Sequence, residues 1–139
     1  MNVTVDGLHI NYTVQGEGPA VVLLHGWGAN LQSFRMVQDF LSRNFRTYAI
    51  DLPGFGESDE PPVAWGVPEY TDFLHKWLTS LNIENPILVG HSNGGRISIM
   101  YASSRPVRKI ILIDSAGIKP KRKLGYYVRY IPTRPPRTC

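Results

Sequence analysis

The pattern G-x-S-x-G at residues 90–94 is the strongest constraint on the fold, because it directly follows the apolar run 86–89 and precedes a helix-like segment. A serine on a sharp turn from strand to helix has a strained backbone, and the residues two positions away must be small for the turn to close. Gly90 and Gly94 meet that need. The pattern therefore predicts a buried strand, a tight turn and a helix, with Ser92 as a candidate nucleophile.

The predicted position of Ser92 has a chemical consequence. At the start of a helix, unpaired backbone N–H groups and the helix dipole favour the negative charge that develops on an attacked carbonyl group. The same five residues also occur in ordinary turns, since turns are rich in Gly and Ser. The pattern alone thus leaves two interpretations of Ser92, a nucleophile or a turn serine.

Two further segments favour the nucleophile. In residues 19–28, an apolar strand ends in the turn His25-Gly26-Trp27, which can direct a backbone N–H towards a substrate. In residues 48–58, another apolar strand runs into a loop rich in Gly and Pro. The three segments, in this order and at these separations, resemble the N-terminal half of an α/β-hydrolase of the small esterase, C–C hydrolase and cofactor-free haloperoxidase type.

The resemblance implies a role for each motif residue. Ser92 would attack an ester-like carbonyl and form an acyl-enzyme, and the backbone N–H groups of Trp27 and Asn93 would form the oxyanion hole. Motif positions that brace the elbow and the oxyanion loop are occupied by His25, Gly26, Gly90, His91 and Gly94. No cofactor is implied.

The resemblance does not supply a general base. In the family the catalytic histidine comes from a loop after the eighth strand, so we expect none of the four histidines to act as base: His9, His25, His75 and His91. Asp51 matches a structural position, and Asp114 matches the position where a minority of related lipases place the triad acid. We therefore expect this chain to be nearly inactive.

Hydrophobic patterning predicts the order of the elements. An Asp6-Gly7 turn separates two alternating strands within residues 3–14. Apolar strands are then predicted at 21–24, 46–50, 87–89 and 107–113, and helices at 34–41, 69–81 and 94–103. On one helical face we expect Phe34, Val37, Phe40 and Leu41. The fold class is α/β, a mostly parallel sheet with helices on both faces, truncated after the sixth strand. The uncovered apolar edge of that strand predicts self-association.

Acidic residues occur only in residues 1–114, whereas basic residues occur on both sides of residue 114. Residues 115–139 contain seven of the 15 Lys and Arg and none of the 11 Asp and Glu. We interpret residues 1–114 as the N-terminal part of the hydrolase core and 115–139 as the start of a cap or an aberrant C-terminal tail, whose Pro-rich end, 131–139, cannot form a regular helix or a central strand. Basic tails can bind nucleic acid or anionic lipid, but no recognition motif accompanies this one, so we predict neither partner.

Other chemistries lack support. Gly54-Phe55-Gly56 has no third glycine for a dinucleotide loop, no phosphate loop occurs, and no metal-ligand spacing is present. Serine rather than aspartate at the elbow disfavours relatives that attack through a carboxylate. The single cysteine, Cys139, and the absence of a signal-like or membrane-spanning segment predict a cytoplasmic protein.

Two functions remain. The first is a serine-dependent hydrolase of a small ester, thioester or related carbonyl substrate, incomplete as given. The alternative is a non-catalytic member of the fold that binds a ligand or another protein. In either case the partner expected at the site is a small molecule.

Overall fold

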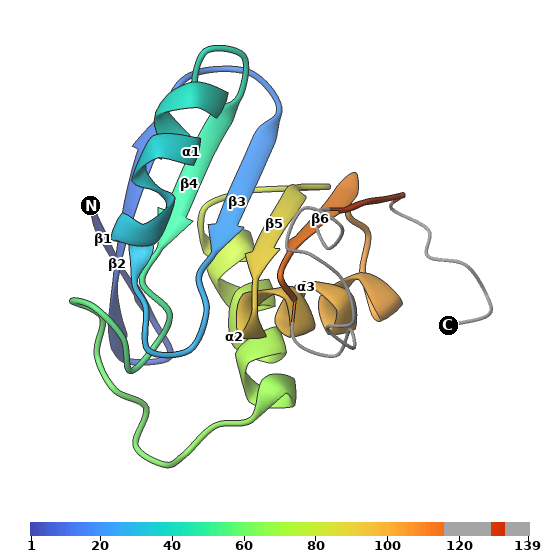
Figure 1. Cartoon of the computed structure of the whole chain (residues 1–139). Helices are drawn as coiled ribbons and strands as arrows, with labels where there is room; N and C mark the ends of the chain where they lie inside the picture. Colours follow the sequence, from blue (N-terminus) through green and yellow to red (C-terminus); the bar gives the residue numbers. More distant parts are fainter. Residues whose placement is uncertain (116–128, 133–139) are drawn as a thin grey trace.

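One sheet of seven strands organises the computed structural model, which describes residues 1–115 and 129–132 (Figure 1). The strand order is β1-β2-β4-β3-β5-β6-β7. The four central strands are parallel to one another, whereas β1, β2 and β7 are each antiparallel to a neighbour. The strands are β1 Asn2–Val5, β2 Leu8–Gln15, β3 Ala20–Leu24, β4 Arg46–Ile50, β5 Ile87–His91, β6 Lys109–Ile113 and β7 Arg129–Pro132.

Helices cover both faces of this sheet. The 3-10 turn η1 (Leu31–Phe34) and helix α1 (Arg35–Leu41) lie on one face, and α2 (Val67–Ser80) and α3 (Asn93–Ser104) lie on the other (Figure 1). Each face has its own buried apolar cluster, because the central strands are apolar on both sides. Trp77, Leu74 and Ile97 fill the α2 and α3 side, and Phe34 packs on the other. The predicted fold class is confirmed.

The first hairpin shows how local sequence sets the register. Asp6 and Gly7 have positive φ angles of 49° and 80°, as the mirror-image turn of a two-residue hairpin requires. Val5 therefore pairs with Leu8, and β2 continues as the antiparallel neighbour of β4.

The α1 segment differs from the prediction in its buried face. Phe34 is buried and Leu41 is half-buried, but Val37 and Phe40 are 36% and 64% exposed. Six residues correspond to 600° of helical rotation, so Phe40 lies about 120° away from Phe34 around the axis. The buried position is instead Gln38, whose amide oxygen accepts a hydrogen bond from the Thr13 hydroxyl at 3.0 Å.

The edge of β6 also differs from the prediction. Residues 129–132 pair with residues 109–112 as the antiparallel strand β7, so the β6 edge is covered rather than open. An unpaired edge exposes a row of N–H and C=O groups, and β7 pairs with them. Pro132 is compatible with this arrangement, because proline occurs in edge strands. The predictions for the rest of residues 116–139, a cap or an aberrant tail, lie outside the described residues.

Candidate functional site

Ser92 lies at the junction of β5 and α3, where its backbone angles are φ 52° and ψ −116°. Positive φ is costly for a residue with a side chain and persists only when its surroundings impose it. Here the Ser92 N–H donates to the Ile113 carbonyl of β6 at 3.1 Å, and the Ser92 carbonyl accepts from the Gly95 N–H at 3.0 Å. The neighbouring strand and the first turn of the helix thus impose the strained turn that G-x-S-x-G predicts.

The two glycines of the motif are required by close backbone packing. A Cβ atom on Gly90 would lie 2.5 Å from the Gly94 carbonyl oxygen. A Cβ atom on Gly94 would overlap the Leu24 carbonyl oxygen at the end of β3. The elbow is therefore pressed against both its own helix and the neighbouring strand, and any larger residue would push α3 away from the sheet.

The loop after β3 lies directly against the nucleophile. A Cβ atom on Gly26 would be 3.0 Å from both the Ser92 Cβ and the His91 Nδ1. Within residues 1–115 and 129–132, the backbone N–H groups of Trp27 and Asn93 donate to no protein acceptor. Two donors without a protein acceptor thus come from the two segments that meet at Ser92, and they stay the candidate donors of an oxyanion hole.

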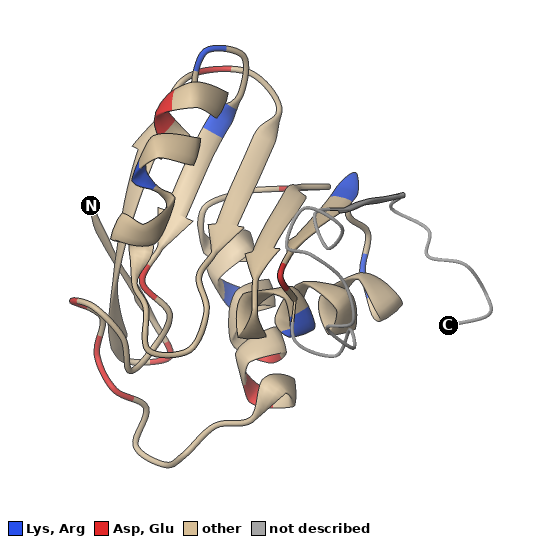
Figure 2. Cartoon of the chain, in the orientation of Figure 1, with Lys and Arg blue, Asp and Glu red and all other residues tan. Residues whose placement is uncertain are grey.

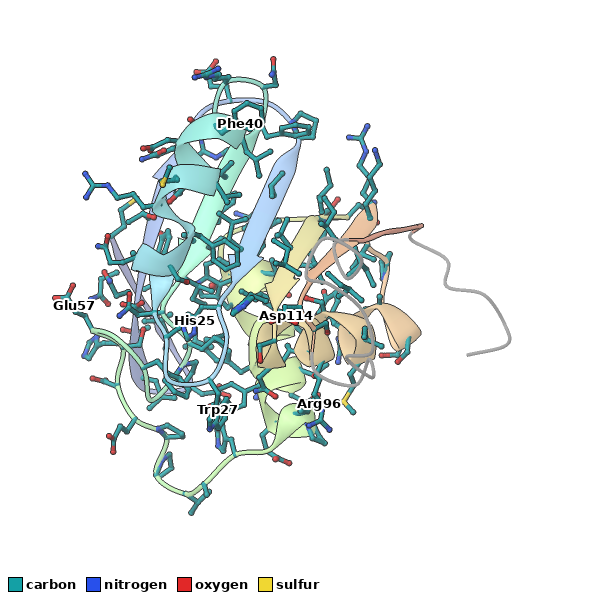
Figure 3. The ribbon with its side chains drawn as sticks, viewed as in Figure 1. His25, Trp27, Phe40, Glu57, Arg96 and Asp114 are labelled. Atoms are coloured by element: carbon teal, nitrogen blue, oxygen red, sulfur yellow. The ribbon has the colours of Figure 1, made fainter. Side chains whose placement is uncertain are left out.

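His25 is fully buried and uses both ring nitrogens (Figure 3). The Leu52 N–H donates to its Nε2 at 3.0 Å, so the ring proton resides on Nδ1, which lies 2.8 Å from the Gly26 carbonyl oxygen and donates to it. Burial lowers the pKa of His25, against smaller opposing contributions from the Gly26 hydrogen bond and the Asp51 charge. The ring is neutral and has no free nitrogen, so it cannot act as a general base.

The hydrogen bonds of His25 also orient the candidate oxyanion donor. The Gly26 carbonyl accepts from the His25 ring and from the Ala29 N–H at 3.1 Å. In a planar trans peptide the C=O and the following N–H point in opposite directions. Fixing the Gly26 carbonyl therefore fixes the direction of the Trp27 N–H.

Asp51 holds the loop after β4. Its buried carboxylate accepts hydrogen bonds from the Leu31 N–H at 2.8 Å, the Glu57 N–H at 2.9 Å and the Asn11 side chain at 3.0 Å. A carboxylate with three donors from three segments is an organising group, and both of its oxygens are occupied by these protein donors. This geometry agrees with the structural role expected for Asp51.

The remaining acid and base candidates are dispersed. His9 is exposed on the first hairpin, His75 is half-buried on α2, and His91 is half-buried beside Gly26. In the part of the chain that the structure describes, none of them forms a hydrogen bond with the Ser92 hydroxyl. Asp114 is exposed at the end of β6, the strand next to β5 (Figure 3).

Sequence reasoning did not find the side chains around Trp27. A cavity of about 350 Å³ adjoins the oxyanion loop, and we call it the aromatic cavity; its walls include Trp27, Phe55, Trp65 and Tyr70. These residues come from three separate segments of the chain, so no local pattern could have joined them. The one available signal was the presence of aromatic residues in loops, where they tend to pack against one another.

The described residues contain neither a membrane-spanning helix nor a cluster of metal ligands. No helix among them is long and apolar enough to cross a bilayer. Residues 1–115 and 129–132 also contain no group of three His, Cys, Asp or Glu side chains placed to hold a metal ion.

Comparison with known proteins identifies the family. The sequence profile of the family described as alpha/beta hydrolase fold matches residues 19–138, which is most of the chain. The chain therefore belongs to the α/β-hydrolase fold family.

Its relatives include proteins named as hydrolases. The chain is 30% identical over 122 residues to 2-hydroxy-6-oxo-6-(2'-aminophenyl)hexa-2,4-dienoic acid hydrolase of Metapseudomonas resinovorans, covering 84% of this chain and 42% of that protein. It is 35% identical over 117 residues to an uncharacterized protein of Mycobacterium tuberculosis, covering 83% of this chain and 34% of the relative. A crystal structure of a membrane phospholipase A superposes with a TM-score of 0.83 at 32% identity, covering 88% of this chain and 41% of that one. The chain thus spans less than half the length of these relatives.

Proposed function

We propose that this chain carries the nucleophile and the oxyanion hole of a serine-dependent hydrolase of a small ester, thioester or related carbonyl compound. The observation that carries the proposal is the positive φ of Ser92, imposed by β6 and α3, directly against the Gly26 loop. Strain of this kind is typical of functional sites. The relatives named as hydrolases support the reaction class.

In the proposed reaction, the Ser92 Oγ attacks the substrate carbonyl carbon and its proton passes to a base, which then donates this proton to the oxygen or sulfur of the leaving group. The carbonyl oxygen becomes an oxyanion that accepts hydrogen bonds from the Trp27 and Asn93 N–H groups. Collapse of this intermediate expels the alcohol or thiol and leaves an acyl-enzyme, which water then hydrolyses. Each backbone donor stabilises the transition state by roughly 3 kcal/mol, so the two account for a large share of the catalysis.

Covalent labelling tests the nucleophile. We expect a fluorophosphonate to add once to the 15.6 kDa chain, slowly because no described histidine reaches Ser92, and intact-mass spectrometry detects the adduct. Ser92→Ala should abolish the adduct, whereas Ser103→Ala, which alters an exposed serine on the same helix, should keep it. An adduct that persists in Ser92→Ala, or no adduct at any reagent concentration, would rule out Ser92 as the nucleophile.

Turnover gives a second test. Without triad function an oxyanion hole and binding retain only about 10³–10⁴-fold acceleration over water. We therefore expect p-nitrophenyl acetate hydrolysis far below that of an ordinary esterase. Rapid turnover that Ser92→Ala abolishes would contradict this expectation and would indicate a base among the four histidines.

The alternative is a ligand-binding or interaction module without catalysis. One observation favours it: no described histidine is hydrogen-bonded to Ser92. Such a module would bind small molecules at the same site but would show no adduct in the labelling experiment.

A further inference from the structure

The aromatic cavity beside the oxyanion loop has features of its own. Trp27 belongs both to the loop that faces Ser92 and to the wall of the cavity. A ligand in the cavity therefore lies next to the candidate oxyanion hole. Besides its aromatic side chains, the lining includes Pro61, Pro62 and one ionisable carboxylate, Glu60.

The rings meet at steep angles. Trp27 makes an angle of 64° with Phe55 at 4.9 Å between ring centroids, and an angle of 82° with Tyr70 at 5.5 Å. Trp65 and Tyr70 are 5.2 Å apart at 80°. A flat ligand stacks best between nearly parallel rings, and none of these three pairs provides such a slot. The rings of each pair touch, so a ligand lies over the joined rings and not between two of them, and their different tilts suit a compact, rounded group better than a flat one.

The cavity is held in place before any ligand arrives. Tyr70 is almost fully buried and its hydroxyl donates to the Pro53 carbonyl at 2.7 Å. Burial raises the pKa of Tyr70, so the phenol stays neutral. Phe55 packs against the fixed His25 ring at 5.4 Å. Trp27, in contrast, is 56% exposed, which leaves its ring accessible.

The loop that supplies most of the cavity lining carries negative charge. Residues 51–66, which supply Phe55, Glu60 and Trp65, contain four Asp and Glu and no Lys or Arg. Figure 2 shows this loop with acidic and without basic positions. The faces of aromatic rings carry negative electrostatic potential and attract cations within about 6 Å. Rings and carboxylate therefore favour a positively charged ligand and oppose an anion.

We propose that the aromatic cavity binds an alkylammonium group of about the size of trimethylammonium. Aromatic walls with a nearby carboxylate recognise such cations by cation–π attraction and charge pairing. A substrate of Ser92 would then carry this group close to its ester-like carbonyl. That last step rests on the proposed function, whereas binding of the cation does not.

The experiment compares two ligands that have nearly the same shape. Choline has a charged nitrogen at the centre of its trimethylammonium group. In 3,3-dimethylbutan-1-ol a neutral carbon takes the place of that nitrogen. We would titrate each into the 139-residue protein and follow binding by saturation-transfer NMR of the ligand methyl groups. We expect choline to bind at least about tenfold more tightly, with an affinity that falls as salt is added.

Variants locate the site. Trp65→Leu should weaken choline binding about fivefold, and Glu60→Gln, at an exposed carboxylate, about two- to fivefold. Glu57→Gln is the matched control, because it removes the same charge from the same loop but lies outside the cavity lining, and Figure 3 shows Glu57 well away from Trp27. Phe40→Leu removes an exposed aromatic residue on α1 and should also leave binding unchanged.

Three outcomes would overturn the inference: equal or tighter binding of the neutral alcohol, no binding of either compound, or equal losses in Glu57→Gln and Glu60→Gln. Binding is measured without catalysis, and Ser92→Ala should retain it. Choline binding without fluorophosphonate labelling would therefore reject the proposed function alone, and labelling without choline binding would reject the cation site alone.

Discussion

His25 links the loop after β3 to the loop after β4 through its two ring nitrogens. One nitrogen accepts from the Leu52 N–H and the other donates to the Gly26 carbonyl, so a single neutral ring sets the spacing between the loops. A protonated ring would have to turn an N–H towards the Leu52 N–H. The charge of His25 therefore affects both the stability of the fold and the direction of the Trp27 N–H.

This coupling predicts a loss of stability in mild acid. The pKa of His25 is lowered in the folded protein, chiefly by burial, so the unfolded chain binds more protons below the ordinary histidine pKa of about 6.5. The contribution of the neutral His25 ring to the free energy of unfolding is fully present above about pH 6.5. It declines as the pH falls from there to the pKa of the folded state, by at most about 1.4 kcal/mol per pH unit.

Urea unfolding between pH 7.5 and pH 5 measures the effect. His25→Asn should be less stable at pH 7.5, because the Leu52 N–H loses its acceptor, but its stability should depend less on pH. His9→Asn, at an exposed position, should keep the wild-type slope. The same slope in wild type and His25→Asn would show that another group is responsible.

At the scale of elements, the turn from β5 to α3 depends on the absence of side chains at two positions. We expect Gly94→Ala to destabilise the protein by about 2 kcal/mol or more, because the new Cβ would overlap the Leu24 carbonyl oxygen, a backbone atom that cannot rotate away. Thermal or urea unfolding measures the loss, and fluorophosphonate labelling of Ser92 should slow with it.

Gly66→Ala is the control for that substitution. Gly66 precedes α2 with extended backbone, φ −99°, and its added Cβ would mainly meet the flexible Glu69 side chain at 3.2 Å. Gly66 is the N-cap of α2, where alanine is less favourable than glycine, so we expect a loss of about 1 kcal/mol or less. Equal losses at Gly66 and Gly94 would show that close packing of the elbow is not the cause.

The elements differ in how far the sequence predicts them. The central strands are mostly apolar, as in β3, whose sequence is AVVLL, and the predicted strand 46–50 coincides with β4, of which only Arg46 is exposed. The exposed Phe40 and the buried Gln38 were not predictable in the same way, since hydrogen bonding to Thr13 decides which side of α1 faces the sheet. The motif residues at Ser92 are contiguous and were found, whereas the aromatic cavity joins distant segments and was missed.

At the scale of the whole molecule, the described sheet ends at β1 on one side and at β7 on the other. The core strands β3, β4, β5 and β6 all lie between these edges, so the elbow and the oxyanion loop are built from the most protected part of the sheet. The backbone of β7 lies next to β6, whose Ile113 carbonyl holds the Ser92 N–H. The strand β6 thus pairs with β7 along its sequence and also holds the Ser92 backbone through Ile113.

We expect pairing with β7 to limit self-association through the β6 edge. In an antiparallel strand successive N–H groups point to opposite sides, so one of residues 130 and 131 must point its N–H towards β6. The double substitution Tyr130→Pro and Ile131→Pro removes that donor whichever residue carries it, and we expect the exposed β6 edge to cause concentration-dependent self-association. The double alanine variant keeps both N–H groups and should behave like the wild type in sedimentation velocity. If the proline variant stays as dispersed as the alanine variant at all concentrations, pairing with β7 is not what limits association of the sheet.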